Sequence, residues 1–413
     1  MTDKLDRRHF LRGALAAGAG LTAAGAASAK EDDAKKGGKK DDKKDDKKAA
    51  DPSKPAKTVP RRQLGGTGET IPILLFGCAQ RFDPRYDKML HRGFKDGINY
   101  LDTALVYARG MSHKTLAPFI KQVGRKKLWI TSKAPHRGNR ADVSSYTTDL
   151  DKCLKQLKVD QLDLFFMHAL NNAKYVTKEY VKMGERMKKQ NKIRFFGFSC
   201  HDGNVVELLN KAAAVGGIDA IMFRYNFAQY GDKKLNKAID ACKKAKIGLI
   251  AMKTQRSVKN QNEKVTKFES KNFTLAQAKL KAVWADERID SAVSHMDNMR
   301  KLKENVAAAK SPIKISMNEF QQLQRIATCT NVCNGCTQHC EAAVDGETKV
   351  ADALRFLMYH DAYGEREKAK ELYRELSPAE RRFETIDFTA ATQACPEGID
   401  IRAQLERARD ILA

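Results

Sequence analysis

Four polar residues end or follow short apolar runs in the first half of the chain: Asp102, Tyr107, Lys133 and His168. A nearby ammonium group lowers the pKa of a phenol from about 10, and a carboxylate can hold that ammonium in place. An imidazole beside them orients a carbonyl group against the phenol. If the fold brings these four side chains together, the set predicts a general acid for carbonyl reduction.

A second group of reactive residues lies near the C-terminus, where five of the nine cysteines follow residue 328. These five are Cys329, Cys333, Cys336, Cys340 and Cys395. Such spacing is typical of iron–sulfur, zinc or disulfide sites, and the odd fifth thiol counts against disulfides. We therefore favour iron–sulfur and keep zinc and disulfides as alternatives. The other four cysteines are scattered through strand and helix patterns, which predicts small apolar core residues: Cys78, Cys153, Cys200 and Cys242.

Short apolar runs alternate with amphipathic segments from Thr70 onward, which is the pattern of βα units around a parallel sheet. Strands are predicted at Ile71–Gly77, Ile98–Thr103, Leu128–Lys133, Leu162–His168, Ile193–Ser199, Ala220–Arg224, Ile247–Lys253 and Ile289–Ser294. No Gly-x-Gly-x-x-Gly turn follows the first run, so we prefer a closed (β/α)8 TIM barrel to a doubly wound open sheet. The barrel should end near Lys310. Its active site should lie at the carboxyl ends of the strands, where the four polar residues occur.

The barrel region resembles the aldo/keto reductases over about residues 60–310. The shared motifs are Arg62-Gln63-Leu64-Gly65-Gly66-Thr67-Gly68, Gly97-Ile98-Asn99-Tyr100-Leu101-Asp102-Thr103-Ala104 with Tyr107, Thr131-Ser132-Lys133, Leu162-Asp163-Leu164 with His168, and Gly197-Phe198-Ser199. The resemblance implies that Tyr107 is the proton donor, that Lys133 and Asp102 tune it, and that His168 orients the substrate. The implied small-molecule substrate is a carbonyl compound or an alcohol.

The same resemblance implies a nicotinamide cofactor, and we favour NADP while keeping NAD possible. The implied cofactor-binding residues are Ser199, Asn226, Met252, Lys253, Asn298, Arg300 and Asn305. Asp297 disfavours a 2′-phosphate, whereas Arg300 favours one. This sequence departs from the family pattern at Leu105 and His113, where glutamates are common, and Met222 stands at the place of a glutamine that contacts the nicotinamide amide.

Residues 313–413 resemble the helical ferredoxin-like extension of some aldo/keto reductases. The matching segments are Ala353-Leu354-Arg355-Phe356-Leu357-Met358-Tyr359 with Tyr363-Gly364, and Cys395-Pro396-Glu397-Gly398-Ile399-Asp400-Ile401. The resemblance implies a mainly helical domain with one 4Fe-4S cluster, because the second cysteine run has lost three of its members. Its ligands are predicted to be Cys329, Cys333, Cys336 and the remote Cys395, and Cys340 is the alternative fourth ligand.

The N-terminus predicts export. Arg7-Arg8 precede Phe10-Leu11, an uncharged stretch covers Gly13–Ala29, and Ala27-Ser28-Ala29 forms a small-residue cleavage site. Residues 1–29 thus resemble a twin-arginine signal peptide, which implies passage of the folded protein through the twin-arginine translocase into the periplasm or beyond. Residues 30–58, rich in lysine and aspartate, are predicted to be a disordered linker between the signal peptide and a barrel domain of residues 59–312. No segment is long and apolar enough for a stable membrane span.

Charge narrows the choice of ligands. Residues 58–413 hold 61 basic and 41 acidic residues, a net charge of +20. Such a body favours anionic ligands, including phosphorylated cofactors, but no nucleic-acid motif accompanies the charge, so nucleic acid is not an expected partner. The leading hypothesis is an exported oxidoreductase. The alternative is a barrel without turnover that serves as an exported iron–sulfur binding or electron-transfer partner, because no free nicotinamide pool is expected outside the cytoplasm.

Overall fold

The computed structural model describes residues 54–135, 143–200, 204–255, 268–328, 333, 335, 337–344, 348–363 and 365–413. The predicted signal peptide, most of the predicted linker and the two cysteines Cys329 and Cys336 lie outside the described residues. Within the described part of the chain, no helix has the length and apolar character needed to cross a membrane.

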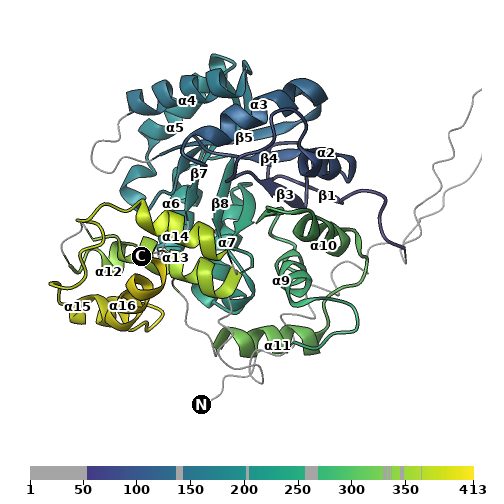
Figure 1. Cartoon of the computed structure of the whole chain (residues 1–413). Coiled ribbons are helices and arrows are strands. Elements are labelled where there is room, and N and C mark those ends of the chain that lie inside the picture. The colour runs from purple at the N-terminus through teal and green to yellow at the C-terminus, as the bar shows by residue number, and fades with distance from the viewer. Residues whose placement is uncertain are drawn as a thin grey trace, which may run out of the picture. The chain divides into compact units, whose positions relative to one another are not determined.

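Eight parallel strands close into a barrel, in the order β10-β3-β4-β5-β6-β7-β8-β9 (Figure 1). They are β3 (Leu74–Gly77), β4 (Tyr100–Asp102), β5 (Trp129–Pro135), β6 (Leu162–His168), β7 (Ile193–Cys200), β8 (Ala220–Arg224), β9 (Gly248–Met252) and β10 (Ser291–His295). The prediction of a closed barrel rather than an open sheet is confirmed.

Helices surround the strands. They are α2 (Lys88–Lys95), α3 (Met111–Val123), α4 (Val143–Leu157), α5 (Lys178–Lys189), α6 (Val205–Val215), α7 (Lys233–Lys244), α9 (Leu275–Trp284) and α10 (Met299–Lys310), with the short 3-10 helices η1 (Arg125–Lys127), η3 (Ala173–Tyr175) and η4 (Phe227–Gln229). Capping residues in the local sequence determine where several of these helices begin. Thr274 and Gln277 form a capping box at α9, and the Asp232 carboxylate accepts two backbone N–H bonds at the start of α7.

The prediction of one strand over Ile71–Gly77 is wrong. The segment divides into β2 (Thr70–Pro72), which pairs antiparallel with β1 (Arg61–Gln63), and the barrel strand β3. Pro72 has no backbone N–H and so cannot donate to a strand ladder. This explains why β2 ends at Pro72 and why the rest of the apolar run pairs with other strands. The hairpin that the two extra strands form precedes the barrel.

Two apolar layers make the barrel core. The larger lies between the strands and the helices and includes the four scattered cysteines, all of them buried, so their prediction as core residues is confirmed: Cys78, Cys153, Cys200 and Cys242. The smaller fills the barrel interior and includes Tyr100, Leu164, Phe166, Met222 and Ile250. A filled interior leaves the chemistry to the mouth at the carboxyl ends of the strands.

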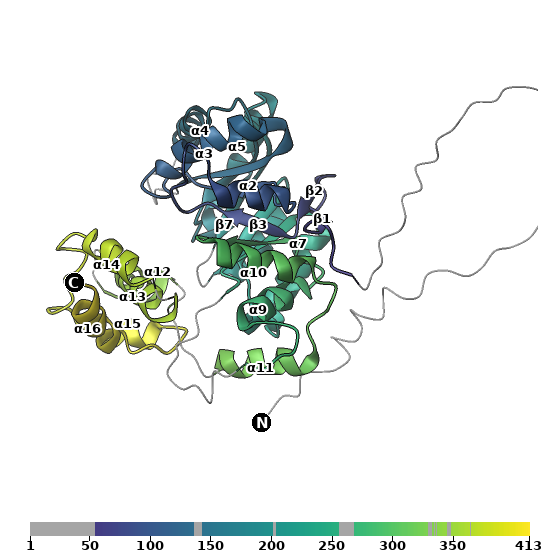
Figure 2. The same ribbon diagram turned by 45° about the vertical axis from the view of Figure 1, so that its right-hand side comes forward.

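Six helices follow the barrel: α11 (Met317–Thr328), α12 (Thr337–Cys340), α13 (Val350–Tyr363), α14 (Arg366–Arg374), α15 (Thr389–Ala394) and α16 (Ile401–Leu412). Phe320 and Leu323 of α11 share an apolar cluster with Phe227 and Phe273, which belong to the preceding βα units. Helices α12 to α16 gather into one group, visible in Figure 2, around a core of their own that includes Phe356. We call this group the C-terminal helical domain.

Candidate active site

The structure brings Asp102, Tyr107, Lys133 and His168, here called the tetrad, to one side of the barrel mouth. Asp102 ends β4, Lys133 lies in β5 and His168 ends β6. The Lys133 ammonium donates hydrogen bonds to Asp102 Oδ1 at 2.6 Å and to the Thr103 carbonyl at 3.0 Å. Both charged side chains are almost fully buried, so each serves as the other's counter-charge.

Tyr107 lies against this ion pair. Lys133 Nζ is 5.0 Å from the centre of the Tyr107 ring. The His168 ring meets the Tyr107 ring edge-on, with 5.5 Å between ring centres and an angle of 80°. A phenol, its proton-tuning ammonium and an imidazole therefore meet at one place, as carbonyl reduction requires.

A strained turn positions Tyr107. The two residues after it, Ala108 and Arg109, have left-handed backbones with φ of 50° and 53°, and Gly110 follows at 77°. A left-handed conformation costs about 1–2 kcal/mol for a residue other than glycine. The turn is held by the Tyr107 carbonyl, which accepts hydrogen bonds from the N–H groups of Gly110 and Ser112. This strain lies directly beside the proposed acid, as is frequent at functional sites.

Burial dominates the ionisation of the tetrad. It raises the pKa of Tyr107 above its ordinary value, although the Lys133 ammonium acts in the opposite direction. The prediction of a lowered phenol pKa is therefore wrong in its net direction. Burial also raises the pKa of Asp102 against the effect of Lys133. Burial lowers the pKa of Lys133, but Asp102 and Tyr107 outweigh it and raise that pKa above its ordinary value. Lys133 is thus a stable cation and Tyr107 a protonated phenol at neutral pH.

Several predicted nicotinamide contacts lie at the ends of β7, β8 and β9, the strands that follow β6 around the barrel. Ser199 Oγ accepts a hydrogen bond from the Ala169 N–H at 2.9 Å, which fixes the residue after His168. Asn226 caps η4 and donates to the Lys253 carbonyl at 3.3 Å. Met252 ends β9, and Lys253 follows it with a left-handed φ of 58°.

The remaining predicted contacts lie around the start of α10. Asn298 caps this helix by accepting from the Lys301 N–H at 2.9 Å, and buried Asn305 donates to Ser294 Oγ at 2.9 Å. Arg300 is largely exposed, with a side-chain exposure of 76%, and lies 3.4 Å from Glu304. Asn305 thus holds β10 to α10, whereas Arg300 lies on the surface.

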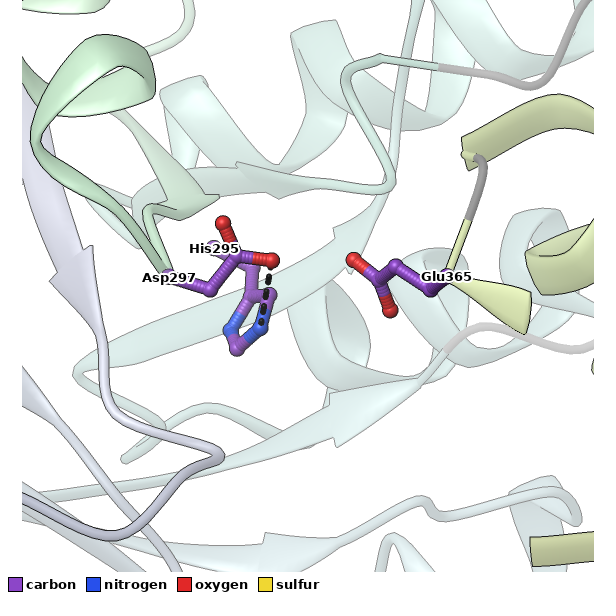
Figure 3. A group of neighbouring side chains, drawn as sticks. All are labelled: His295, Asp297 and Glu365. Carbon is purple, nitrogen blue, oxygen red and sulfur yellow. Dashed lines mark ion pairs between the residues drawn. The ribbon is translucent and has the colours of Figure 1, made fainter. Parts of the chain in front are cut away.

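A cluster that sequence analysis did not predict joins this loop to the C-terminal helical domain. Figure 3 shows His295, Asp297 and Glu365 converging, with ligand-capable atoms within 4.8 Å of one another. The Lys301 ammonium lies 2.8 Å from Asp297 Oδ2 and 3.3 Å from Glu365 Oε1. Lys301 therefore supplies the positive charge that the two carboxylates need, and the group is an ion-pair cluster.

Helix α14 contacts the barrel at both of its ends. Its N-cap Glu365 pairs with Lys301, beside the start of α10. At its other end, Glu375 pairs with Arg109, and Glu371 lies 4.0 Å from the same guanidinium. Arg109 follows Tyr107 by two residues, so the C-terminal helical domain contacts the turn that carries the proposed acid.

The C-terminal helical domain contains a cavity lined by Cys333, Cys340 and Cys395, with His339 at its wall. Cys340 is buried, while the other two cysteines are partly exposed. Among the described residues, these three sulfurs do not form a group within 4.8 Å of one another. Three thiols that line one cavity are donors that suit a zinc ion and an iron–sulfur cluster alike.

Comparison with known proteins shows what the barrel is similar to. The aldo/keto reductase family model matches residues 79–278. L-galactose dehydrogenase of Arabidopsis thaliana is 22% identical over 291 residues, which cover 62% of this chain and 90% of that protein. The uncharacterized oxidoreductase YqkF of Bacillus subtilis is 22% identical over 303 residues, covering 64% of this chain and 95% of that protein.

Solved structures agree on the fold. The holo form of an aldo-keto reductase from Bacillus halodurans matches with a TM-score of 0.55 and 18% identity, covering 66% of this chain and 97% of that one. An aldo-keto reductase from Klebsiella pneumoniae in complex with NADPH matches with a TM-score of 0.50 and 20% identity, covering 64% of this chain and 95% of that one. Residues 79–278, which hold the whole tetrad, thus match the aldo/keto reductase family model, and the barrel has the fold of the solved aldo-keto reductases.

Proposed function

We propose that this protein is an exported oxidoreductase that reduces a carbonyl compound, or oxidises the matching alcohol, with NADP as the cofactor. The observation that carries the proposal is the tetrad: a buried Lys133–Asp102 pair at 2.6 Å directly beside Tyr107 and His168. A reduced nicotinamide supplies hydride to the carbonyl carbon when it is bound. The chain's own part is to place the carbonyl oxygen between His168 and Tyr107, and to pass the Tyr107 phenolic proton to that oxygen.

The mouth residues fit an anionic cofactor. Arg224 ends β8, and its Nε atom is buried without a hydrogen-bond partner in the described part of the chain. Lys253 lies beside it at the end of β9. Cationic side chains with unused hydrogen-bond donors suit the phosphates of a nicotinamide dinucleotide. Support for a nicotinamide also comes from relatives: the xylose reductase of Candida tenuis is named as NAD(P)H-dependent and is 27% identical over 144 residues, covering 33% of this chain and 39% of that protein.

The test of this proposal is an anaerobic purification followed by an assay of NADPH oxidation with a panel of aldehydes and ketones. Carbonyl-dependent oxidation of NADPH is the expected result. If the protein binds NADPH but does not oxidise it with any of the carbonyl compounds, this result supports the alternative of an iron–sulfur electron-transfer protein without turnover. The visible spectrum of the same preparation shows whether a cluster is present.

We also propose that the C-terminal helical domain holds one 4Fe-4S cluster. The cavity lined by Cys333, Cys340 and Cys395 supports this, and Cys329 and Cys336 complete the candidate set in the sequence. The cluster either transfers electrons to and from an electron-transfer partner or stabilises the helices around it.

The identity of the fourth ligand is a separate prediction. Cys395→Ser is expected to abolish iron and acid-labile sulfide, whereas Cys340→Ser is expected to retain both, because Cys395 keeps the following proline that is usual after a remote ligand. Iron and sulfide content of the two variants, purified without oxygen, measures the outcome. Loss with Cys340→Ser alone would reverse the assignment, and zinc in place of iron would exclude both versions.

Export is proposed from the N-terminal sequence, which lies outside the described residues. Replacing Arg7 and Arg8 by Lys should block processing, because the twin-arginine pathway reads the arginine pair rather than its charge. Arg12→Lys makes the same chemical change outside the pair and should be processed normally. The size of the protein in periplasmic and whole-cell fractions measures the effect, and normal export of the double variant would remove the assignment.

A further inference from the structure

Two cations lie at the ends of neighbouring barrel strands on the side away from the tetrad, and a third, from the C-terminal helical domain, acts on one of them. Arg224 ends β8, Lys253 follows β9, and Arg355 lies on α13 of the C-terminal helical domain. The pairing of β8 with β9 sets Arg224 opposite Met252, the residue before Lys253. Burial lowers the pKa of Lys253, and the positive charges of Arg355 and Arg224 also lower it, whereas Tyr359 and Cys333 act in the opposite direction. Arg224 and Arg355 are therefore each close enough to Lys253 to act on it.

These cations lack sufficient negative charge. Arg355 donates from Nη2 to Asp352 at 2.6 Å, and Glu341 also acts on it. In the part of the chain that the structure describes, neither the Arg224 side chain nor the Lys253 ammonium makes a hydrogen bond or an ion pair with a carboxylate. A buried donor without a partner and two unpaired cations side by side are both unfavourable. An anion bound between them offsets both costs.

The place of these cations favours phosphate as that anion. β9 and β10 are the seventh and eighth strands of the barrel, and TIM barrels frequently bind phosphate groups at the loops after these two strands. A guanidinium can donate two parallel N–H bonds to phosphate oxygens, and the buried Nε atoms of Arg224 and Arg355 are both available for this. The Cys333 sulfur acts on both Lys253 and Arg355, so the proposed cluster, if ligated by Cys333, would be a competing anion.

We propose that Arg224, Lys253 and Arg355 together bind the diphosphate of the dinucleotide, so that the C-terminal helical domain supplies one wall of the cofactor site. This inference rests on the proposed function, because it takes a nicotinamide dinucleotide as the ligand. It gives the C-terminal helical domain a direct part in cofactor binding, in addition to any role of the cluster. The barrel alone then holds an incomplete site.

The experiment measures NADPH affinity of the full-length protein by calorimetry and by quenching of tryptophan fluorescence. Arg224→Met and Arg355→Met are each expected to weaken binding about ten-fold or more, since each removes charged hydrogen bonds to the diphosphate. Arg355→Lys keeps the positive charge but loses the paired N–H donors of the guanidinium, so its NADPH affinity should lie between those of the wild type and Arg355→Met. Arg366→Met removes an exposed arginine of α14 and serves as the matched control. Circular dichroism verifies that each variant folds.

Two further arms identify the anion. Inorganic pyrophosphate should displace NADPH from the wild type but should no longer displace it from Arg355→Met. Adenosine, which has no phosphate, should bind the wild type and all variants with the same affinity. Unchanged NADPH affinity in Arg224→Met and Arg355→Met overturns the inference and leaves the proposed function standing. A shift in the cluster's midpoint potential together with unchanged affinity would overturn it in favour of the cluster. A wild type that does not bind NADPH overturns both proposals.

Discussion

Tyr107→Phe is expected to lower carbonyl reduction by about 10²–10⁴-fold while leaving NADPH affinity within a factor of two. Phenylalanine keeps the ring that lies beside Lys133 and His168, but it has no proton to give to the developing alkoxide. The loss should appear in kcat and in kcat/KM equally, because the missing interaction exists only in the transition state.

Tyr86→Phe is a suitable control for this change. Tyr86 is exposed and stacks on His91, away from the tetrad, so the same loss of a hydroxyl should not alter the rate. Turnover that persists in Tyr107→Phe would remove Tyr107 as the acid.

Lys133→Met is expected to have the second-largest effect, on both rate and stability. Without the ammonium, the Asp102 carboxylate is left almost fully buried and uncompensated, and removal of one partner of a buried pair costs about 3–5 kcal/mol. The pKa of Tyr107, already raised by burial, should rise further because Lys133 is the group that opposes this rise. Urea unfolding and steady-state kinetics measure the two effects separately.

The double variant Lys133→Met with Asp102→Asn separates structure from chemistry. It removes both charges together, so the free energy of unfolding should recover most of the loss, whereas the rate should stay low. Recovery of the rate along with stability would show that Lys133 acts only by supporting the fold. A stable but inactive double variant supports its role beside the phenol.

Strand bounds follow from sequence where a buried run lies between polar residues. The predicted bounds of β6 and β8, Leu162–His168 and Ala220–Arg224, agree with the structure because β8 is apolar up to Arg224 and β6 is apolar from Leu164 up to His168. The prediction of one strand over Ile71–Gly77 failed because no polar residue marks the point where the first strand ends. An apolar run can belong to two sheets, and only the missing N–H of Pro72 marks the division.

Sequence could also predict the meeting of the tetrad, because the carboxyl ends of barrel strands converge. It could not predict the net pKa of Tyr107. That value depends on how completely the surrounding chain excludes water, which is a property of the packed molecule rather than of neighbouring residues.

The contacts of the C-terminal helical domain were beyond prediction for a different reason. Lys301, Glu365, Arg109 and Glu375 are charged residues on or beside surface helices, where solvation is the usual outcome. Which of them meet depends on how two distant segments pack.

The two-ended attachment of α14 places a limit on its length. Glu365 reaches Lys301 from one end, and Glu371 and Glu375, four residues apart on one helix face, reach Arg109 from the other. One inserted or deleted residue would turn one end relative to the other by about 100° and move it by about 1.5 Å. Either change takes the carboxylates off Arg109 or off Lys301. The helical phase of α14 is thus fixed by the barrel, so insertions are best accommodated in loops outside this helix.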